Sequence, residues 1–453
     1  MSLGLADMVP HLEHVPLVRR QGRVVQVVGT VIEADLPGVA VGELTEVGPT
    51  MAEVIGFRGH RALLMPLGSL EGVSHGSVVR VRSTSLSMPV GPGLLGRVVD
   101  PLGAPMDGRP LTDVPFRRSL QGNAPDPMLR HRILEPLPTG IRALDGMLTL
   151  GVGQRIAVMA GSGVGKSTLM GMAARNSRAD INVVALIGER GREVREFLEQ
   201  DLGAEGLARS VIVLATSDAS PVVQVKAMSA ALAIAEYFRD QDQRVLMMVD
   251  SLTRLAMAQR QIGLSAGEPP TTKGYTPSVF TMMPRLLERA GPGAGKGSIT
   301  GLFTVLVEGD DMDDPVADTV RGIVDGHVVL SRKLASYGHY PAIDILQSVS
   351  RTMPNTTTPE QVAWASRVRA LIATYRENEE LIRLGAYKQG TDPEVDAAIA
   401  AHKPIDAFLR QVVDDATEWQ DCLQRLAALT APMVPRGQAG ARRPRRGDRG
   451  GRS

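Results

Sequence analysis

The stretch RIAVMAGSGVGKST, residues 155–168, decides the fold. It begins as an uninterrupted apolar run, which is typical of a strand buried on both faces of a sheet. It continues close to the phosphate-binding pattern G-x-x-x-x-G-K-[ST]. The glycines let backbone N–H groups curl around phosphate oxygens, and the next helix presents its positive end to them. This order of strand, loop and helix predicts a nucleotide-binding α/β core.

The loop also predicts individual contacts. Lys166 is expected to reach the β- and γ-phosphates, and the Ser167 hydroxyl to ligate Mg²⁺. Ala160 stands at the first glycine position of the pattern, where a small residue leaving the strand suffices. The predicted nucleotide-binding residues of the loop are Gly161, Ser162, Gly163, Val164, Gly165, Lys166, Ser167 and Thr168.

Two further apolar runs lead to a carboxylate, at Glu189 and at Asp250. Because parallel strands end at the same edge of a sheet, we expect both carboxylates to lie near Lys166. Asp250 is predicted to hold the magnesium ion, partly through water, and Glu189 to orient the attacking water. Arg190 is a further catalytic candidate because it follows Glu189. The alternative is that these acids only start helices, with a cap at Asp250 or Ser251.

Three regions follow one another along the chain. Residues 22–84 hold short β-branched segments between Gly, Pro and Asp, which predict a small closed β-barrel. Strands and helices then alternate up to about residue 351, which predicts a doubly wound parallel sheet. The last part has helical stretches at 356–385, 391–402 and 404–429. The predicted divisions are a docking segment 1–21, a barrel 22–88, a nucleotide-binding core 89–354, a helical domain 355–430 and a disordered Arg-rich tail 431–453.

Composition limits the classes of function. The 50 basic and 49 acidic side chains give a net charge of +1, so there is no global attraction to nucleic acid. The single cysteine, Cys422, cannot form an internal disulfide, which fits a reducing compartment. The chain shows neither a secretory signal nor an apolar stretch of membrane-spanning length. We therefore expect a cytoplasmic protein, whose N-terminal segment either docks on a partner or a membrane surface, or frays.

Taken together, the motifs resemble those of the ATPases of type III protein export, found in flagellar assembly and in injectisomes. That family is related to the catalytic subunits of rotary ATP synthases. The resemblance covers roughly residues 20–425, and in general terms it favours the flagellar branch. It is carried by GLLGRVVDPLGAPMDG (93–108), GSGVGKST (161–168), IGERGREVREF (187–197), GEPPTTKGYTPSVF (267–280), VEGDDMDDPVAD (307–318) and GHYPAIDILQSVSR (338–351).

The resemblance implies a homohexameric ring with nucleotide sites between subunits. Arg351 matches the arginine finger that reaches a neighbour's γ-phosphate, and Tyr340 matches the aromatic residue that stacks on adenine. Glu189 marks a catalytic subunit, because related non-catalytic subunits carry Gln there. Lys273 and Tyr275 belong to a loop that the family places near the central pore. They are expected either to face the pore or to pack between subunits.

The resemblance also implies partners. They are a peripheral-stalk regulator at the N-terminal segment, a stalk-like protein in the pore, the export gate, and chaperone–substrate complexes at the helical domain. It places the chain at the inner face of the membrane, with peripheral membrane association allowed and no specific nucleic acid. Two alternatives stay open here: a catalytic subunit of a rotary ATP synthase, and an RNA-translocating ring helicase. Phe57 is the only Phe, Tyr or Trp in the sequence of residues 22–84, which disfavours an RNA-binding barrel.

Overall fold

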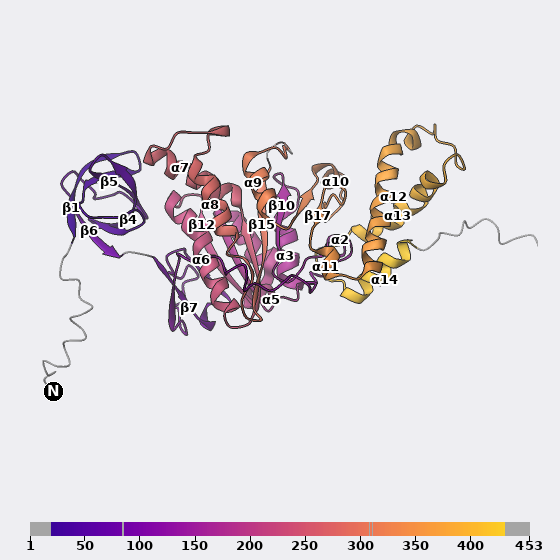
Figure 1. Cartoon of the computed structure of the whole chain (residues 1–453), viewed down its shortest axis with the longest axis horizontal. Coiled ribbons are helices and arrows are strands. Elements are labelled where there is room, and N and C mark those ends of the chain that lie inside the picture. The colour runs from indigo at the N-terminus through magenta and orange to yellow at the C-terminus, as the bar shows by residue number, and fades with distance from the viewer. Residues whose placement is uncertain (1–19, 84–85, 308, 310, 431–453) are drawn as a thin grey trace, which may run out of the picture.

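The computed structural model describes residues 20–83, 86–307, 309 and 311–430. A barrel, a core with a mostly parallel sheet and a helical end follow one another along the long axis of the molecule (Figure 1). The predicted fold class is therefore confirmed. Nearly all of the predicted docking segment 1–21, and the whole of the tail 431–453, lie outside the described residues.

The N-terminal barrel is closed, with strand order β1-β2-β5-β4-β3-β6. Its strands are β1 (Gln21–Val28), β2 (Val31–Asp35), β3 (Leu44–Val47), β4 (Thr50–Arg58), β5 (Arg61–Pro66) and β6 (Val78–Ser83). Along β4, alternate residues such as Ala52 and Val54 are buried, as expected for a strand with one face toward a barrel core. Closure leaves the barrel without an unpaired strand edge.

The core is built on a nine-stranded sheet whose main path runs β17-β16-β10-β15-β13-β11-β12-β8. Its strands are β8 (Arg97–Val99), β10 (Arg155–Ala160), β11 (Ile181–Glu189), β12 (Ser210–Thr216), β13 (Arg244–Asp250), β14 (Gly291–Pro292), β15 (Ser298–Leu306), β16 (Gly326–Leu330) and β17 (Val349–Ser350). Neighbours pair in parallel, except that β14 and β17 are antiparallel to theirs. A separate antiparallel pair is formed by β7 (Ser87–Val90) and β9 (Phe116–Ser119), which lie before and after β8 in the chain.

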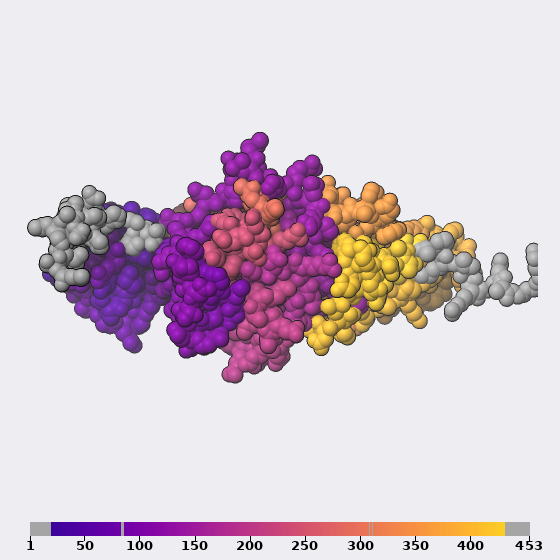
Figure 2. Space-filling view, turned by 90° about the horizontal axis from the view of Figure 1, so that it is seen from below, coloured from indigo at the N-terminus to yellow at the C-terminus, as the bar shows by residue number. Residues whose placement is uncertain are grey.

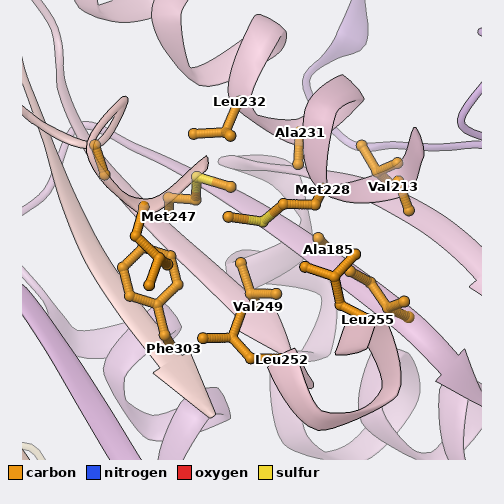
Figure 3. Close-up of a cluster of buried hydrophobic side chains, with 14 of the residues drawn as sticks. Ala185, Val213, Met228, Ala231, Leu232, Met247, Val249, Leu252, Leu255 and Phe303 are labelled. Carbon is orange, nitrogen blue, oxygen red and sulfur yellow. The ribbon is translucent and has the colours of Figure 1, made fainter. Parts of the chain in front are cut away.

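Both faces of this sheet are buried. In β11, Val183 and Ala185 belong to one hydrophobic cluster, while Val184 and Leu186 belong to another on the opposite face. Figure 3 shows part of the first cluster, where Met228 of the covering helix lies near strand residues such as Ala185. This double burial explains why the strands read as continuous apolar runs rather than as alternating ones.

Helices cover the two faces. The core helices are α2 (Arg142–Met147), α3 (Lys166–Asn176), α4 (Gly191–Glu196), α5 (Gly203–Ala208), α6 (Pro221–Arg239), α7 (Leu252–Ala266), α8 (Pro277–Leu287), α9 (Pro315–Ile323), α10 (Arg332–Ser336) and α11 (Met353–Thr356). Single turns of other helical types occupy Pro92–Leu94, Phe197–Leu202 and Thr272–Gly274. α6 to α9 contribute to one cluster, and α2 and α3 to the other. The result is a three-layer core.

The helical end consists of α12 (Pro359–Arg383), α13 (Pro393–Leu409) and α14 (Trp419–Thr430). It forms the orange and yellow mass at one end of the molecule (Figure 2). The prediction of a separate stretch starting at Pro404 is wrong, because α13 continues through this proline. Burial of Ile405 and Phe408 beyond it offsets the lost hydrogen bond and the ring's clash. The predicted domain divisions stay a prediction.

None of the helices in the described part of the chain combines the length and the apolar character needed to cross a bilayer.

Candidate nucleotide-binding site

The phosphate loop links β10 to α3. Ala160 is the buried last residue of β10, and Lys166 is the first residue of α3. Between them, Gly163 and Gly165 have φ of 76° and 90°, values that glycine adopts without strain. A cavity of about 590 Å³ opens beside the loop and is lined by Lys166 and Ser167 among others. The loop therefore has the backbone conformation and the space that a polyphosphate requires.

The structure brings Lys166, Glu189 and Asp250 together. Lys166 Nζ donates to Asp250 Oδ1 at 2.5 Å and lies 3.9 Å from Glu189 Oε1. The reason lies in the sheet: β11 and β13 are parallel neighbours, with Leu186 opposite Asp250. Both strands end at the edge where the phosphate loop begins. One largely buried cation thus stands between two carboxylates beside the phosphate cavity.

Glu189 has an unusual acidity. Burial, the nearby Asp250 carboxylate and a hydrogen bond with Glu193 raise the pKa of Glu189 to about 7, although the charge of Lys166 opposes this. Such a pKa makes the carboxylate a stronger proton acceptor than an exposed glutamate. A perturbed acid in a cleft is also a common mark of a functional site.

Asp250 is oriented by a hydrogen bond from the neighbouring strand β15. Thr304 Oγ1 donates to Asp250 Oδ1 at 2.8 Å, and Asp250 is almost fully buried. The helix cap proposed as an alternative is supplied by Ser251, whose Oγ accepts from Arg254 N at 3.3 Å. The Asp250 carboxylate is therefore not used for capping and points toward Lys166.

Two arginines flank the carboxylates. Arg190 lines the cavity, and its guanidinium is largely exposed, 3.6 Å from Glu193. Arg254, which the sequence analysis missed, lines the same cavity one helical turn after Asp250. Its Nε is buried and has no hydrogen-bond partner among the described residues. A basic residue four positions after a strand-end carboxylate was the available signal.

Tyr340 lies at the other end of the phosphate loop. A Cβ on Gly165 would stand 3.5 Å from the Tyr340 ring, so glycine permits this close approach. Tyr340 is 45% exposed, which rules out a core tyrosine. It lines a cavity of about 730 Å³ together with Leu169, Val412 and Val413. We call this cavity the base slot, because the motif resemblance predicts that an adenine base stacks on Tyr340.

Arg351 is not part of this cluster. It directly follows β17, where Ser350 pairs with Gly326, the first residue of β16. It therefore lies near the N-terminal ends of the parallel strands, whereas the phosphate loop follows their C-terminal ends. The separation along the strands is roughly 16 Å. Its side chain is exposed, and Nη1 donates to Val324 O at 3.3 Å. Within one chain, Arg351 is remote from the phosphate loop.

The loop predicted to lie near a pore divides into two environments. Lys273 is exposed and pairs with Asp311 at 2.9 Å. This ion pair joins the loop between α7 and α8 to the loop between β15 and α9. Tyr275 is 4% exposed and packs edge-on against Phe280, with ring centroids 6.1 Å apart. The expectation that Tyr275 faces a pore is wrong, because the ring fills the hydrophobic cluster under α8.

The fold and this site are those of a P-loop ATPase of the ATP synthase type. Residues 140–350 match the ATP synthase alpha/beta family, nucleotide-binding domain, and residues 24–81 match the beta-barrel domain of the same family. Residues 357–428 match the T3SS EscN ATPase C-terminal domain. The three matches follow the order of barrel, core and helical end.

Individual relatives define the family more narrowly than the domain matches do. The chain is 48% identical to the flagellum-specific ATP synthase of Bacillus subtilis, over 94% of this chain and 98% of that protein. It is 51% identical to the type 3 secretion system ATPase of Xanthomonas euvesicatoria, over 91% and 94%. Its structure matches the assembled ATPase EscN from enteropathogenic E. coli, with a TM-score of 0.87, 46% identity and coverage of 90% and 99%. A second EscN structure, with its central stalk EscO, matches with a TM-score of 0.84, 45% identity and the same coverage.

The chain therefore belongs to the family of flagellar and type III secretion ATPases. This confirms the resemblance drawn from the motifs and the prediction of an ATP-hydrolysing enzyme. The two alternatives, a rotary synthase subunit and an RNA helicase, are not supported by these relatives.

Proposed function

We propose that this chain hydrolyses Mg-ATP in a homohexameric ring and thereby energises the unfolding and export of type III substrates. The observation that carries the proposal is the meeting of Lys166, Glu189 and Asp250 at the phosphate loop of a chain from this family. Flagellar and injectisome relatives match at 48% and 51% identity, so the proposal addresses type III export as a whole.

Binding starts with an exchange of partners. A triphosphate entering the cavity competes with Asp250 for Lys166, and the Lys166 ammonium then neutralises β- and γ-phosphate charge. Arg254 supplies a second positive charge at the same wall of the cavity. The Tyr340 ring and the aliphatic side chains of the base slot receive the adenine.

The residues present fit a magnesium ion. The Ser167 hydroxyl borders the cavity, and Lys166 leaves the Asp250 carboxylate when phosphate arrives, so hard oxygen donors become available. Ser167 and Asp250 would hold the ion, Asp250 partly through water. Bound Mg²⁺ supplies charge neutralisation on the phosphate oxygens.

Glu189 then prepares the water. Its carboxylate accepts a hydrogen bond from a water molecule and takes its proton as the water oxygen bonds to the γ-phosphorus. The bond between the γ-phosphorus and the bridging oxygen breaks, and ADP leaves with that electron pair. Arg190 at the rim, and Arg351 from a neighbouring subunit, stabilise the charge of the transition state.

The partners are part of the proposal. EscN assembles and binds its central stalk EscO. By analogy, we propose a stalk-like protein in the pore of this ring. We further propose a peripheral-stalk regulator at residues 1–21, chaperone–substrate complexes and the export gate at the helical end, and a position at the cytoplasmic face of the membrane.

Two measurements test the function. Purified chain should hydrolyse ATP in a magnesium-dependent manner, and Lys166→Ala should abolish this activity. In cells, the same substitution at the chromosomal gene should stop release of export substrates into the medium. The export role would be contradicted if the purified wild-type chain hydrolyses ATP but the Lys166→Ala strain still exports normally. The assignment as an ATPase would then still stand.

A further inference from the structure

The base slot has two walls of different origin. Tyr340 forms the first, on a turn of the core. Val412 and Val413 form the second, and they are 72% and 38% exposed. Both belong to residues 410–418, which connect α13 to α14 and contain no helix or strand. A wall made by an irregular segment keeps its shape only if other contacts hold it.

Arg142 of α2 is one such contact. This buried guanidinium donates to Phe408 O at 2.8 Å, to Asp415 Oδ2 at 2.7 Å and to Thr417 Oγ1 at 2.9 Å. It also donates to Arg410 O. One side chain of the core thereby fixes four points along the segment and its entry.

Gln411 is the second contact, and it lies within the segment itself. Its side chain is 5% exposed, and its Oε1 accepts from Arg142 N at 2.9 Å. Its Nε2 donates to Gly140 O and to Asp415 O, both at 2.7 Å. The amide therefore ties the segment to the core on one side and to itself on the other.

The backbone of Gln411 also joins the two walls. Gln411 N donates to Tyr340 O at 2.8 Å. On the next residues, Arg175 Nη2, from the last turn of α3, donates to Val413 O at 3.0 Å. Gln411 thus connects the Tyr340 wall to the valine wall, and Arg175 connects the valine wall to α3, the helix of the phosphate loop.

We propose that Gln411 is a positioning residue for the nucleotide base: with Arg142, it holds Val412 and Val413 opposite Tyr340 before ATP arrives. The inference rests on the proposed function, since it assumes that the base enters this slot. A pre-formed wall avoids the entropy cost of ordering the segment on binding. Only the base-dependent part of the affinity depends on it, because the phosphate loop is held separately by β10 and α3.

The test compares two inhibitors of ATP hydrolysis, ADP and inorganic pyrophosphate, on the full chain. Gln411→Met keeps the length of the side chain but removes its three hydrogen bonds. We expect the inhibition constant of ADP to rise about tenfold, while that of pyrophosphate stays within about twofold. A general loss of folding would weaken both inhibitors or remove activity.

The chain offers a matched control. Gln361 of α12 is 1% exposed, and its Nε2 donates to Asp145 O and to Thr149 Oγ1, both at 3.0 Å. It also ties the helical end to the core but does not line the base slot. Gln361→Met should lower the melting temperature to a similar extent while leaving both inhibition constants within about twofold of wild type.

The outcomes separate the hypotheses. An equal rise for ADP and pyrophosphate, or no change for either, would overturn the role of Gln411. If Gln411→Met does not fold, Arg175→Met decides, because it removes the bond to Val413 O at the surface. It also removes a bond to Asp201 O beside the phosphate cavity, so the readout is the ratio of the two inhibition constants. This variant should raise the ADP constant about two- to threefold and leave pyrophosphate unchanged, and a flat result would overturn the proposal. A wild-type chain without ATP hydrolysis would instead contradict the proposed function.

Discussion

Glu189 is the residue whose chemistry is tested most directly. In Glu189→Gln the side chain keeps its size but can no longer accept the proton of the attacking water. We expect kcat to fall about 10²–10⁴-fold while ATP binding is retained, because one negative charge leaves the phosphate cavity. Glu199→Gln, which changes an exposed acid in the helical turn Phe197–Leu202 that follows α4, should retain full activity. Near-normal hydrolysis by Glu189→Gln would contradict its role as base.

The pKa of Glu189 predicts a pH dependence. A general base works only when deprotonated, and the pKa of this group is raised to about 7. The value of kcat/KM should therefore rise with pH up to about 7 and then level off, with about tenfold lower activity one unit below the pKa. Steady-state rates from pH 5.5 to 8.5 provide the measurement. The acid limb should be absent from the residual activity of Glu189→Gln.

Single residues also show what could be predicted from sequence. Glu189 and Asp250 each end an apolar run, and Lys166 stands in a glycine-rich loop that follows another, so a parallel sheet places all three at the same end of its strands. Gln411 and Val413 gave no such signal, because their importance arises from contacts with residues far away along the chain. Tyr340 and Arg351 were found only through family resemblance.

At the level of elements, the apolar runs of the core all form strands, because burial on both faces leaves a strong local pattern. The break expected at Pro404 did not occur, since tertiary packing of α13 outweighs the local penalty of proline. The prediction of a continuous helix across 410–418 is also wrong, because this segment is irregular and its conformation depends on Arg142 of α2 rather than on its own residues.

One helix contact is unusual for its burial. Arg289, which follows α8, pairs with Glu236 of α6 at 2.7 Å and also donates to Leu120 O at 3.0 Å. Arg289→Met would leave a buried carboxylate, with Arg118 at 3.2 Å as partial compensation. We expect the free energy of unfolding to fall by about 3 kcal/mol.

Urea denaturation of Arg289→Met, of Glu236→Leu and of the double variant measures this contact. The double variant should lose less stability than the sum of the two single variants, because it leaves no unpaired charge. Arg195→Met, which removes an exposed ion pair with Glu199, should cause no measurable change. Additive losses in the double variant would show that the pair is not coupled.

At the level of the whole molecule, the position of Arg351 has a consequence for assembly. It lies at the sheet edge opposite the phosphate loop, so it can complete a nucleotide site only on another subunit. Lys166→Ala and Arg351→Ala should therefore each be inactive but complement each other when mixed. In a random equimolar mixture, about one interface in four pairs an intact Lys166 with an intact Arg351, since each occurs with probability one half.

ATP hydrolysis of the mixture should then recover to at most about a quarter of the wild-type rate, and recovery should increase steeply with protein concentration. A mixture of Lys166→Ala with Glu189→Gln is the matched control. Both of these defects lie in the same half-site, as the 3.9 Å separation of the two side chains requires, so no interface in that mixture is complete. If the Lys166→Ala and Arg351→Ala mixture behaves like this control although mixed assemblies form, Arg351 does not act between subunits.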